Sequence, residues 1–269
     1  MTTIGTILDT IADHQRRRLA EDMAHESLEE LRQRLASRRR RPHDLNAALR
    51  QPGYSVIAEV KFASPSEGII ATELDPVAVA SDYLKNGARA LSILTEPHFF
   101  KGSLDYLRQV RVAHPEAVLL MKDFLIDPYQ VYQGYEAGCD AILIITALVS
   151  DDSAMRLLST ARGLGLSALV EIHDHAELER ALRCGATLVG VNSRNLKTMA
   201  IDPGLTERLA REVPSSVTLV AESGLSRSGD VVRLAKCGCH AFLIGTAFMK
   251  TQTPGTALGR LLAECRDGS

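Results

Sequence analysis

Residues 137–145 of the chain, Ala-Gly-Cys-Asp-Ala-Ile-Leu-Ile-Ile, contain the pattern that decides the fold. A helical stretch ends in glycine, two residues follow, and a run of apolar residues begins. The pattern recurs at Gly87, Gly185 and Gly238, and the four glycines are spaced 51, 47 and 53 residues apart along the chain. Glycine is the usual residue where a helix ends in a left-handed conformation and the chain turns tightly. Each glycine therefore predicts an αβ turn, and each interval has the length of about two βα units.

Short apolar runs predict the strands of a parallel sheet, because none of them alternates between apolar and polar residues as a half-exposed strand does. They span residues 56–60, 90–94, 118–121, 141–145, 168–172, 188–191, 217–221 and 241–244. Amphipathic stretches between them predict helices, for example at 76–86, 104–113, 128–137 and 176–183. This alternation predicts an α/β protein with a closed (β/α)8 TIM barrel. An open doubly wound sheet is disfavoured, because no Gly-x-Gly-x-x-Gly loop follows the first strand.

We expect the segment before the first strand to form a helical extension of the barrel rather than a further domain. Apolar residues at helical spacing mark residues 4–23, and a second helical segment covers residues 27–36. Four arginines at 38–41 form a basic run without interleaved aromatic residues. We interpret this run as a solvated helix end rather than a nucleic-acid-binding arm. We expect one domain over residues 1–269, in which residues 1 to about 50 pack on the barrel.

Composition excludes several classes of protein. The chain has 269 residues, 45% of them hydrophobic and 24% charged, and its net charge of −2 gives no general attraction to nucleic acid. Its longest apolar stretch, 141–149, is far shorter than the roughly 18 residues of a membrane span, and the N-terminus lacks the apolar core of a signal peptide. Five irregularly spaced cysteines indicate reduced thiols. We expect a cytoplasmic protein without nucleic-acid or membrane partners, monomeric, with a dimer as the alternative.

Charged residues stand at the C-terminal ends of the predicted strands, where the active site of such barrels lies. A single polar residue at a strand end often only hydrogen-bonds a neighbouring residue. Several such residues at corresponding strand ends instead predict an active site at the mouth of the barrel, the end where the strands finish. Burial and mutual charge would shift their pKa values toward acid–base use near neutrality. Glu96, after the second strand, is interpreted as a loop residue. The residues expected at the mouth are Glu59, Lys61, Lys122, Glu171, Asn192 and Glu222.

The loops after the last two strands, Glu222-Ser-Gly-Leu-Ser and Ile244-Gly-Thr-Ala, predict a phosphate site. Glycine lets backbone N–H groups approach phosphate oxygens near the start of a short helix, and barrels of this class bind phosphate there. Ser64 and Thr246 would add hydroxyl groups, and Arg194 would add a positive charge. A phosphorylated small molecule is therefore the expected substrate class.

Two segments rich in histidine or cysteine are weaker signals. His173-Asp-His175 has metal-binding residue types, but nothing else supplies two further ligands. Asp174, with Glu177 three residues on, indicates a helix cap and a capping box instead. Cys237-Gly-Cys239-His240 resembles a metal knuckle, yet it falls in an αβ turn at the opposite end of the barrel from the mouth. We expect no metal and no cofactor.

At these residues the chain resembles the indole-3-glycerol-phosphate synthase family. The resemblance runs from about Leu45 to the C-terminus, with the motifs in order and at the expected spacing. They are Ile-Ala-Glu-Val-Lys and Ala-Ser-Pro-Ser-Glu-Gly within 57–68, Leu-Met-Lys-Asp-Phe, Leu-Val-Glu-Ile, Val-Asn-Ser-Arg-Asn-Leu, Val-Ala-Glu-Ser-Gly and Leu-Ile-Gly-Thr. The family implies closure of 1-(2-carboxyphenylamino)-1-deoxy-D-ribulose 5-phosphate to indole-3-glycerol phosphate, with release of CO₂ and water. This is the ring-forming step of tryptophan biosynthesis.

Carried over by motif, the resemblance implies a role for each site residue. Lys122 would be the general acid at the ketone carbonyl, and Glu171 the base for the final dehydration. Lys61 would pair with the substrate carboxylate and supply a second proton, while Glu59 would hold the lysines. Asn192 and Glu222 would position the substrate. The phosphate would be held by Ser64, Arg194, Gly224, Gly245 and Thr246. Phe100 and Phe124 would stack around the anthranilate ring, and Ser223 would make a further contact with the substrate.

The chain departs from the family pattern in three places. Thr246 stands where the family usually has serine, which keeps a hydroxyl group. Phe62 occupies a place that is often basic in relatives, so a secondary substrate contact would be absent. The arginine-rich leader matches poorly, although family members have an extra N-terminal helical segment that closes over the site.

Three alternatives to this reaction stay open. A sugar-phosphate isomerase barrel would need an Asp or Cys acid–base pair at the strand ends, whereas the first strand has Glu59 and Lys61. A non-catalytic homologue that only binds phosphorylated ligands would be expected to lack Lys122 or Glu171, and both are present. A lyase that forms a Schiff base on Lys122 would be detected by borohydride trapping.

Overall fold

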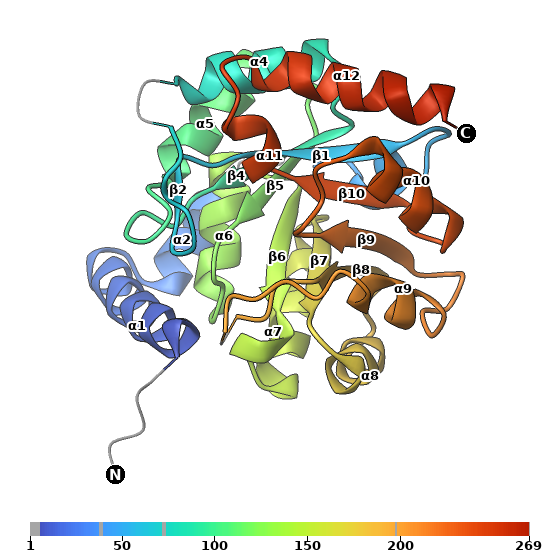
Figure 1. Ribbon diagram of the computed structural model, residues 1–269. Coiled ribbons are helices and arrows are strands. Elements are labelled where there is room, and N and C mark those ends of the chain that lie inside the picture. Colours follow the sequence, from blue (N-terminus) through green and yellow to red (C-terminus); the bar gives the residue numbers. More distant parts are fainter. Residues whose placement is uncertain (1–5, 38–39, 72–73, 197, 269) are drawn as a thin grey trace.

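The computed structural model describes residues 6–37, 40–71, 74–196 and 198–268. Parallel strands close into a barrel surrounded by helices (Figure 1). The ring closes because β1 pairs in parallel with both β4 and β10. The barrel strands are β1 (Ser55–Val60), β4 (Ala90–Leu94), β5 (Leu119–Lys122), β6 (Ala141–Ile145), β7 (Ser167–Ile172), β8 (Leu188–Asn192), β9 (Thr218–Glu222) and β10 (Ala241–Ile244). The predicted (β/α)8 barrel is confirmed, and each predicted strand end lies within one residue of the observed end.

Helices form the outer layer, and α12 runs beside α4 on the outside of the barrel (Figure 1). They are α4 (Pro76–Lys85), α5 (Leu104–Ala113), α6 (Pro128–Ala137), the 3-10 turn η1 (Thr146–Leu148), α7 (Asp151–Gly163), α8 (His175–Arg183), α9 (Leu205–Ala210), α10 (Ser228–Lys236), α11 (Thr246–Met249) and α12 (Pro254–Asp267). The four helices named from the sequence are confirmed as α4, α5, α6 and α8. None of the described helices combines the length and the apolar character needed to cross a membrane.

A small hairpin after β1 was not predicted. It pairs β2 (Ala63–Ser64) with β3 (Gly68–Ile69) in antiparallel register. Strands of this length show no periodicity that a sequence pattern can detect.

The barrel strands are buried on both faces, which explains why their sequences do not alternate. One apolar cluster fills the inside of the barrel, and it includes Ile57, Leu120, Leu143, Leu169 and Val220. A second, larger cluster packs the outer faces of the strands against the helices. Aliphatic residues dominate the inner cluster, as in the packed interior of other barrels of this class.

Glycine forms the predicted αβ turns. Gly138 ends α6 with a φ of 99°, and its N–H bonds the carbonyl of Gly134 at 3.1 Å. Gly87, Gly185 and Gly238 have φ values of 96°, 84° and 101°. Residues with a Cβ are strained in this region, so the repeat marks real conformational requirements.

The N-terminal segment is helical and packs on the barrel, as predicted. It consists of α1 (Ile7–His25), α2 (Leu28–Ala36) and the unpredicted α3 (Leu45–Leu49); the first residues of the predicted segment 4–23 lie outside the described residues. At the mouth end, Gln15 and Arg18 of α1 donate to Asp123, each at 2.9 Å. At the opposite end, α3 buries two leucines in the inner cluster, and its neighbour Arg50 donates to Thr218 at the start of β9. The extension therefore contacts both ends of the barrel.

The prediction of a solvated helix end at the basic run is wrong for Arg40. Helix α2 ends earlier, and Arg40 donates to the fully buried carboxylate of Asp140 at 2.7 Å. Arg111 pairs with the same carboxylate, and Arg40 also lies over the Tyr135 ring at 5.3 Å. Arg40 therefore holds the chain after α2 against the barrel. Arg38 and Arg39 lie outside the described residues.

Candidate active site

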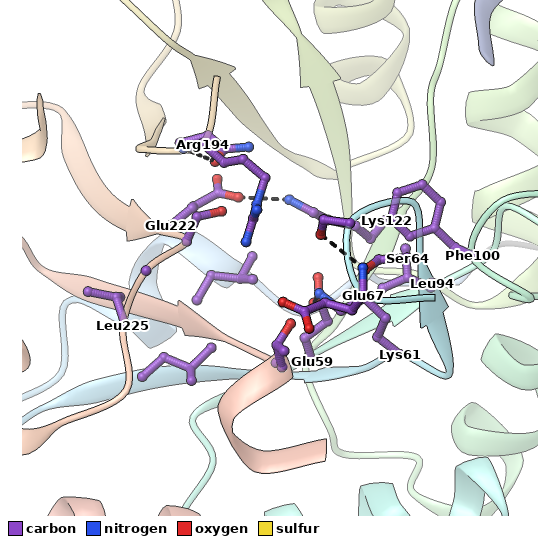
Figure 2. Close-up of a pocket in the computed structure, with 18 of the residues that line it drawn as sticks. Glu59, Lys61, Ser64, Glu67, Leu94, Phe100, Lys122, Arg194, Glu222 and Leu225 are labelled. Atoms are coloured by element: carbon purple, nitrogen blue, oxygen red, sulfur yellow. Dashed lines mark hydrogen bonds and ion pairs between the residues drawn. The ribbon is translucent and has the colours of Figure 1, made fainter. Parts of the chain in front are cut away.

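Every residue predicted for the site lines one cavity of about 510 Å³ at the C-terminal ends of the strands (Figure 2). They come from β1, β2, β5, β7, β8 and β9, from the first residue of α11, and from the loops that follow β1, β4, β5, β8, β9 and β10. Figure 2 shows Lys122 and Glu222 pointing toward one another across this space, while Arg194 extends into it from the loop after β8. The structure thus brings the predicted residues together, and their individual roles remain predictions.

Lys122 is the centre of the charged cluster. Its Nζ donates to Glu171 Oε2 at 2.9 Å and to Glu222 Oε2 at 2.7 Å. The side chain of Lys122 is 14% exposed, whereas those of the two glutamates are almost completely buried. An ammonium group between two carboxylates at the bottom of a cavity has a proton to give and an acceptor on each side.

Burial and charge together set the pKa values of this cluster. Burial alone would lower the pKa of Lys122, but Glu171, Glu222 and Glu59 outweigh it and raise that pKa above its usual value. The pKa of Glu171 is held well below its usual value, because Lys122 and His173 overcome the effect of its burial. Burial raises the pKa of Glu222 to about 7; Lys122 opposes this rise and Glu171 adds to it. Two carboxylates on one ammonium group therefore differ in acidity.

Glu222 owes its place to a glycine on the neighbouring strand. Gly190 of β8 is in register with Glu171 of β7, and a Cβ at this position would overlap the Glu222 carboxylate, 3.1 Å from Cδ. Only glycine leaves room for the carboxylate inside the barrel. Glu222 Oε1 is buried and has no hydrogen-bond partner among the described residues, in agreement with its raised pKa.

Glu59 on β1 and Lys61, the residue after β1, form a second ion pair. Lys61 Nζ lies 2.6 Å from Glu59 Oε2, and the two side chains are 15% and 5% exposed. A Cβ at Gly245, after β10, would lie 2.9 Å from Glu59 Cβ, so glycine again makes space for a carboxylate.

Asn192 and His173 both approach the other oxygen of Glu171. Asn192 Nδ2 donates to Glu171 Oε1 at 3.0 Å, and His173 Nε2 lies 3.4 Å from the same oxygen. The sequence analysis treated His173 only as a candidate metal ligand, and it missed this contact. Its position two residues after Glu171, just beyond the end of β7, was the available signal.

The residues of the predicted phosphate site line the same cavity. Ser223 and Gly224 follow β9 with φ values of 65° and 73°, and α11 begins at Thr246 immediately after Gly245. Arg194 is held by its own loop, since its Nη1 donates to the Met199 carbonyl at 3.0 Å. Consecutive backbone N–H groups, hydroxyls and a guanidinium are the groups that bind phosphate.

The remaining wall is apolar and aromatic. The Phe100 and Phe124 rings lie 5.7 Å apart at 38°, and both line the cavity. Glu96 fixes the loop that carries Phe100, because its carboxylate accepts the N–H groups of residues 98–100 at 2.7–3.0 Å. Its interpretation as a loop residue is confirmed, since it does not line the cavity.

Several lining residues were missed by the sequence analysis. Lys250 of the loop after α11 donates to Glu67 of the β2–β3 hairpin at 2.7 Å, across the rim of the cavity. Met199 and Ile201, from the loop after β8, also line the cavity. Phe62 does not line the cavity; its ring meets Tyr106 edge-on at 5.6 Å.

The weaker signals have structural explanations. Asp174 caps α8 by accepting the Glu177 N–H at 2.8 Å, as predicted, but Glu177 accepts from His173 rather than completing a capping box. His240 accepts the backbone N–H of Leu219. Within the described residues, no group of three or more His, Cys, Asp or Glu side chains is arranged to hold a metal ion.

The chain is similar to known proteins along nearly its whole length. A sequence model of the family described as Indole-3-glycerol phosphate synthase matches residues 8–261. The indole-3-glycerol phosphate synthase of Campylobacter jejuni subsp. jejuni is 42% identical over 258 residues, covering 95% of this chain and all of the relative. Indole-3-glycerol phosphate synthase 1 of Streptomyces coelicolor is 42% identical over 96% of this chain and 95% of its own. The crystal structure of 3-hexulose-6-phosphate synthase from Salmonella typhimurium matches with a TM-score of 0.64 at 12% identity, over 78% of this chain and 99% of that one, which shows a shared fold alone.

Proposed function

Because the chain belongs to the indole-3-glycerol phosphate synthase family, we propose that the cavity at the barrel mouth is its active site. The enzyme is a carboxy-lyase of tryptophan biosynthesis, which converts 1-(2-carboxyphenylamino)-1-deoxy-D-ribulose 5-phosphate to indole-3-glycerol phosphate, CO₂ and water. The observation that carries the placement of the site is the ammonium group of Lys122, which lies between the buried carboxylates of Glu171 and Glu222.

The lining of the cavity orients this substrate. We place the phosphate on the loops at Ser64, Arg194, Gly224, Gly245 and Thr246. We place the aromatic ring against Phe100 and Phe124, and Lys61 at the ring carboxylate. The charged ends of the substrate thus lie on cations or backbone N–H groups, and its ring lies on the apolar wall.

Ring closure begins at the ketone. Lys122 donates a proton to the carbonyl oxygen as the ring carbon that bears the carboxylate attacks the carbonyl carbon. One carbon–carbon bond forms and the ring loses its aromaticity. The bond to the carboxylate then breaks, CO₂ leaves, and its bonding electrons restore the aromatic ring. The energy of rearomatisation drives this step, so the chain's own acid and cations suffice.

Dehydration completes the indole. Glu171, which Lys122 and His173 keep ionised before the reaction starts, takes a proton from the new ring as the hydroxyl group leaves. Lys61 supplies the proton that makes this hydroxyl a water molecule, and Glu59 holds Lys61 at 2.6 Å. Asn192 keeps the Glu171 carboxylate oriented through its bond to Oε1.

One chain supplies every group in this scheme, so we propose that a monomer suffices. The five cysteines are free thiols, which fits a reducing compartment such as the cytoplasm. Neither the isomerase nor the ligand-binding alternative has an observation in its favour.

Replacing Lys122 tests the proposed site. We expect Lys122→Ala to lower turnover by about 10²-fold or more, since general acid catalysis contributes roughly that factor. The assay follows indole fluorescence after addition of the substrate, and circular dichroism checks the fold. Lys85→Ala, at the exposed end of α4, is the matched control and should keep wild-type activity. A folded Lys122→Ala enzyme with wild-type turnover would show that the acid is another residue.

A further inference from the structure

His173 lies just beyond the end of β7, and the reaction scheme uses it only as a neighbour of Glu171. Its side chain is 12% exposed, and Nε2 lies 3.4 Å from Glu171 Oε1 with no hydrogen-bond partner among the described residues. On the other side of the ring, Nδ1 lies 3.1 Å from Glu177 Oε2. That oxygen also accepts the His173 backbone N–H at 2.8 Å. The imidazole is therefore fixed between two carboxylates, one of them in the site.

The ring is a cation at neutral pH. Burial alone would lower the pKa of His173, but the negative charges of Glu171 and Glu177 beside the ring outweigh burial and raise this pKa to about 10. A positive charge this close to a carboxylate favours the ionised carboxylate. His173 does not line the cavity, so it acts on the carboxylate and not on the substrate.

The reaction makes this second cation necessary. In the structure Lys122 neutralises Glu171 at 2.9 Å, but it has to leave Glu171 to protonate the ketone. After that movement the groups at Glu171 are the neutral Asn192 amide and the charged His173 ring. Without His173, the carboxylate that has to accept a proton would stay buried with no cation beside it.

We propose that His173 is a positioning residue that keeps the Glu171 carboxylate anionic and oriented while Lys122 acts on the substrate. The inference rests on the proposed role of Glu171 as the base. Glu177 completes the arrangement, because it holds the ring and its proton from the opposite side. The row of carboxylate, imidazolium and carboxylate runs from Glu177 on α8 through His173 to Glu171 on β7, which lines the cavity.

Among the described residues, few charged groups lie close to Glu171 and His173. Glu171 faces Lys122 from β5 and Glu222 from β9, and β8 contributes the neutral Asn192. On β6, the residue in register with Glu171 is Ile145, which does not titrate. The groups that act on His173 are Glu171 and Glu177. A pH profile that depends on Glu171 therefore reports chiefly on Lys122, Glu222 and His173.

The pH dependence of kcat tests the proposal. His173→Gln keeps a donor near the Nε2 position but removes the charge, so the pKa of Glu171 rises during turnover. We expect the acid limb of the kcat profile to move up by about one pH unit or more, which is about a tenfold loss below the limb. Activity should recover at higher pH, and KM should change much less than kcat. Glu177→Gln, which leaves the ring in place, should move the limb in the same direction.

His175→Gln is the matched control, because this exposed ring lies two residues away and pairs with Glu212 and Glu179 instead. Its profile should equal that of the wild type. An unshifted acid limb in His173→Gln, or an equal loss at every pH, would overturn the inference. If that variant does not fold, an unshifted limb in Glu177→Gln overturns it. Glu171→Gln distinguishes a failure of the proposed base from a failure of the proposed role of His173. High activity in Glu171→Gln refutes Glu171 as the base. An inactive Glu171→Gln together with an unshifted acid limb in His173→Gln refutes only the role of His173.

Discussion

Replacing Glu222 with glutamine should stabilise the fold near neutral pH while it lowers activity. The side chain is 2% exposed, and one of its carboxylate oxygens is buried without a hydrogen-bond partner among the described residues. The other oxygen accepts from Lys122, which a glutamine oxygen can also do. Burial raises the pKa of Glu222 from 4.5 to about 7 even though Lys122 opposes the rise. The charged form is thus unfavourable in the folded state, and a neutral amide avoids that cost.

The size and sign of the effect follow from this shift. A rise from 4.5 to about 7 corresponds to about 3 kcal/mol at about 1.36 kcal/mol for each pH unit. Because the folded pKa lies above the unfolded one, the folded state binds more protons between about pH 4.5 and 7, and the wild type loses stability as the pH rises through that window. Glutamine does not titrate. The advantage of Glu222→Gln should therefore grow from pH 4.5 to 7 and stay near 3 kcal/mol above.

Urea denaturation at several pH values between 5 and 8 measures this difference directly. Glu116→Gln, at an exposed position, corrects for the general effect of exchanging a carboxylate for an amide. The kcat of Glu222→Gln, measured in the same preparations, should fall because Lys122 loses an anionic partner. A stability difference that stays constant across this pH range would refute the reasoning, since it would show that Glu222 does not titrate between the folded and unfolded states as the structure implies.

Two further substitutions test the space and the ion pairs around the barrel. Gly190→Ala should lower kcat at least tenfold, because its methyl group would overlap the Glu222 carboxylate, whereas Gly229→Ala has nothing within 4 Å and should stay active; equal activity of the two would contradict the crowding argument. Asp140→Asn should lower the free energy of unfolding by about 3–5 kcal/mol in urea, because its two arginine partners lose a fully buried anion. The control Asp105→Asn breaks an exposed pair and should cost less than about 1 kcal/mol, so similar losses in both variants would contradict this explanation.

The fold was predictable because its determinants are local. Gly138 and the apolar run after it specify a turn and a buried strand within a few residues, and the same pattern occurs four times. The mouth residues were predictable for a related reason. Lys122 and Glu222 are the last residues of their strands, and a closed parallel barrel brings all such ends to one rim. Knowing the strand ends therefore fixes which side chains share a cavity.

The parts that were not predicted depend on contacts between distant segments. Arg40 lies 100 residues from Asp140 in the chain, and nothing near position 40 indicates that its partner is a buried carboxylate. His173 was examined as a metal ligand because the sequence shows residue types and not directions. Its ring points between Glu171 and Glu177, a fact that depends on how β7 ends and α8 begins.

Glycines behind the carboxylates explain how this site exists inside an apolar barrel. Gly190 makes room for Glu222 and Gly245 makes room for Glu59, so acids occupy space that aliphatic side chains fill deeper in the barrel. Burying Glu222 in this way costs stability, as its raised pKa shows, and Lys122 offsets only part of that cost. A glycine within a predicted strand, such as the one in Leu-Val-Gly-Val-Asn, is therefore a signal for a buried functional group on the neighbouring strand. The stability that the mouth lacks has to come from the aliphatic layers below it and from contacts such as the buried ion pairs of Asp140, because the proposed reaction needs the carboxylates at the mouth.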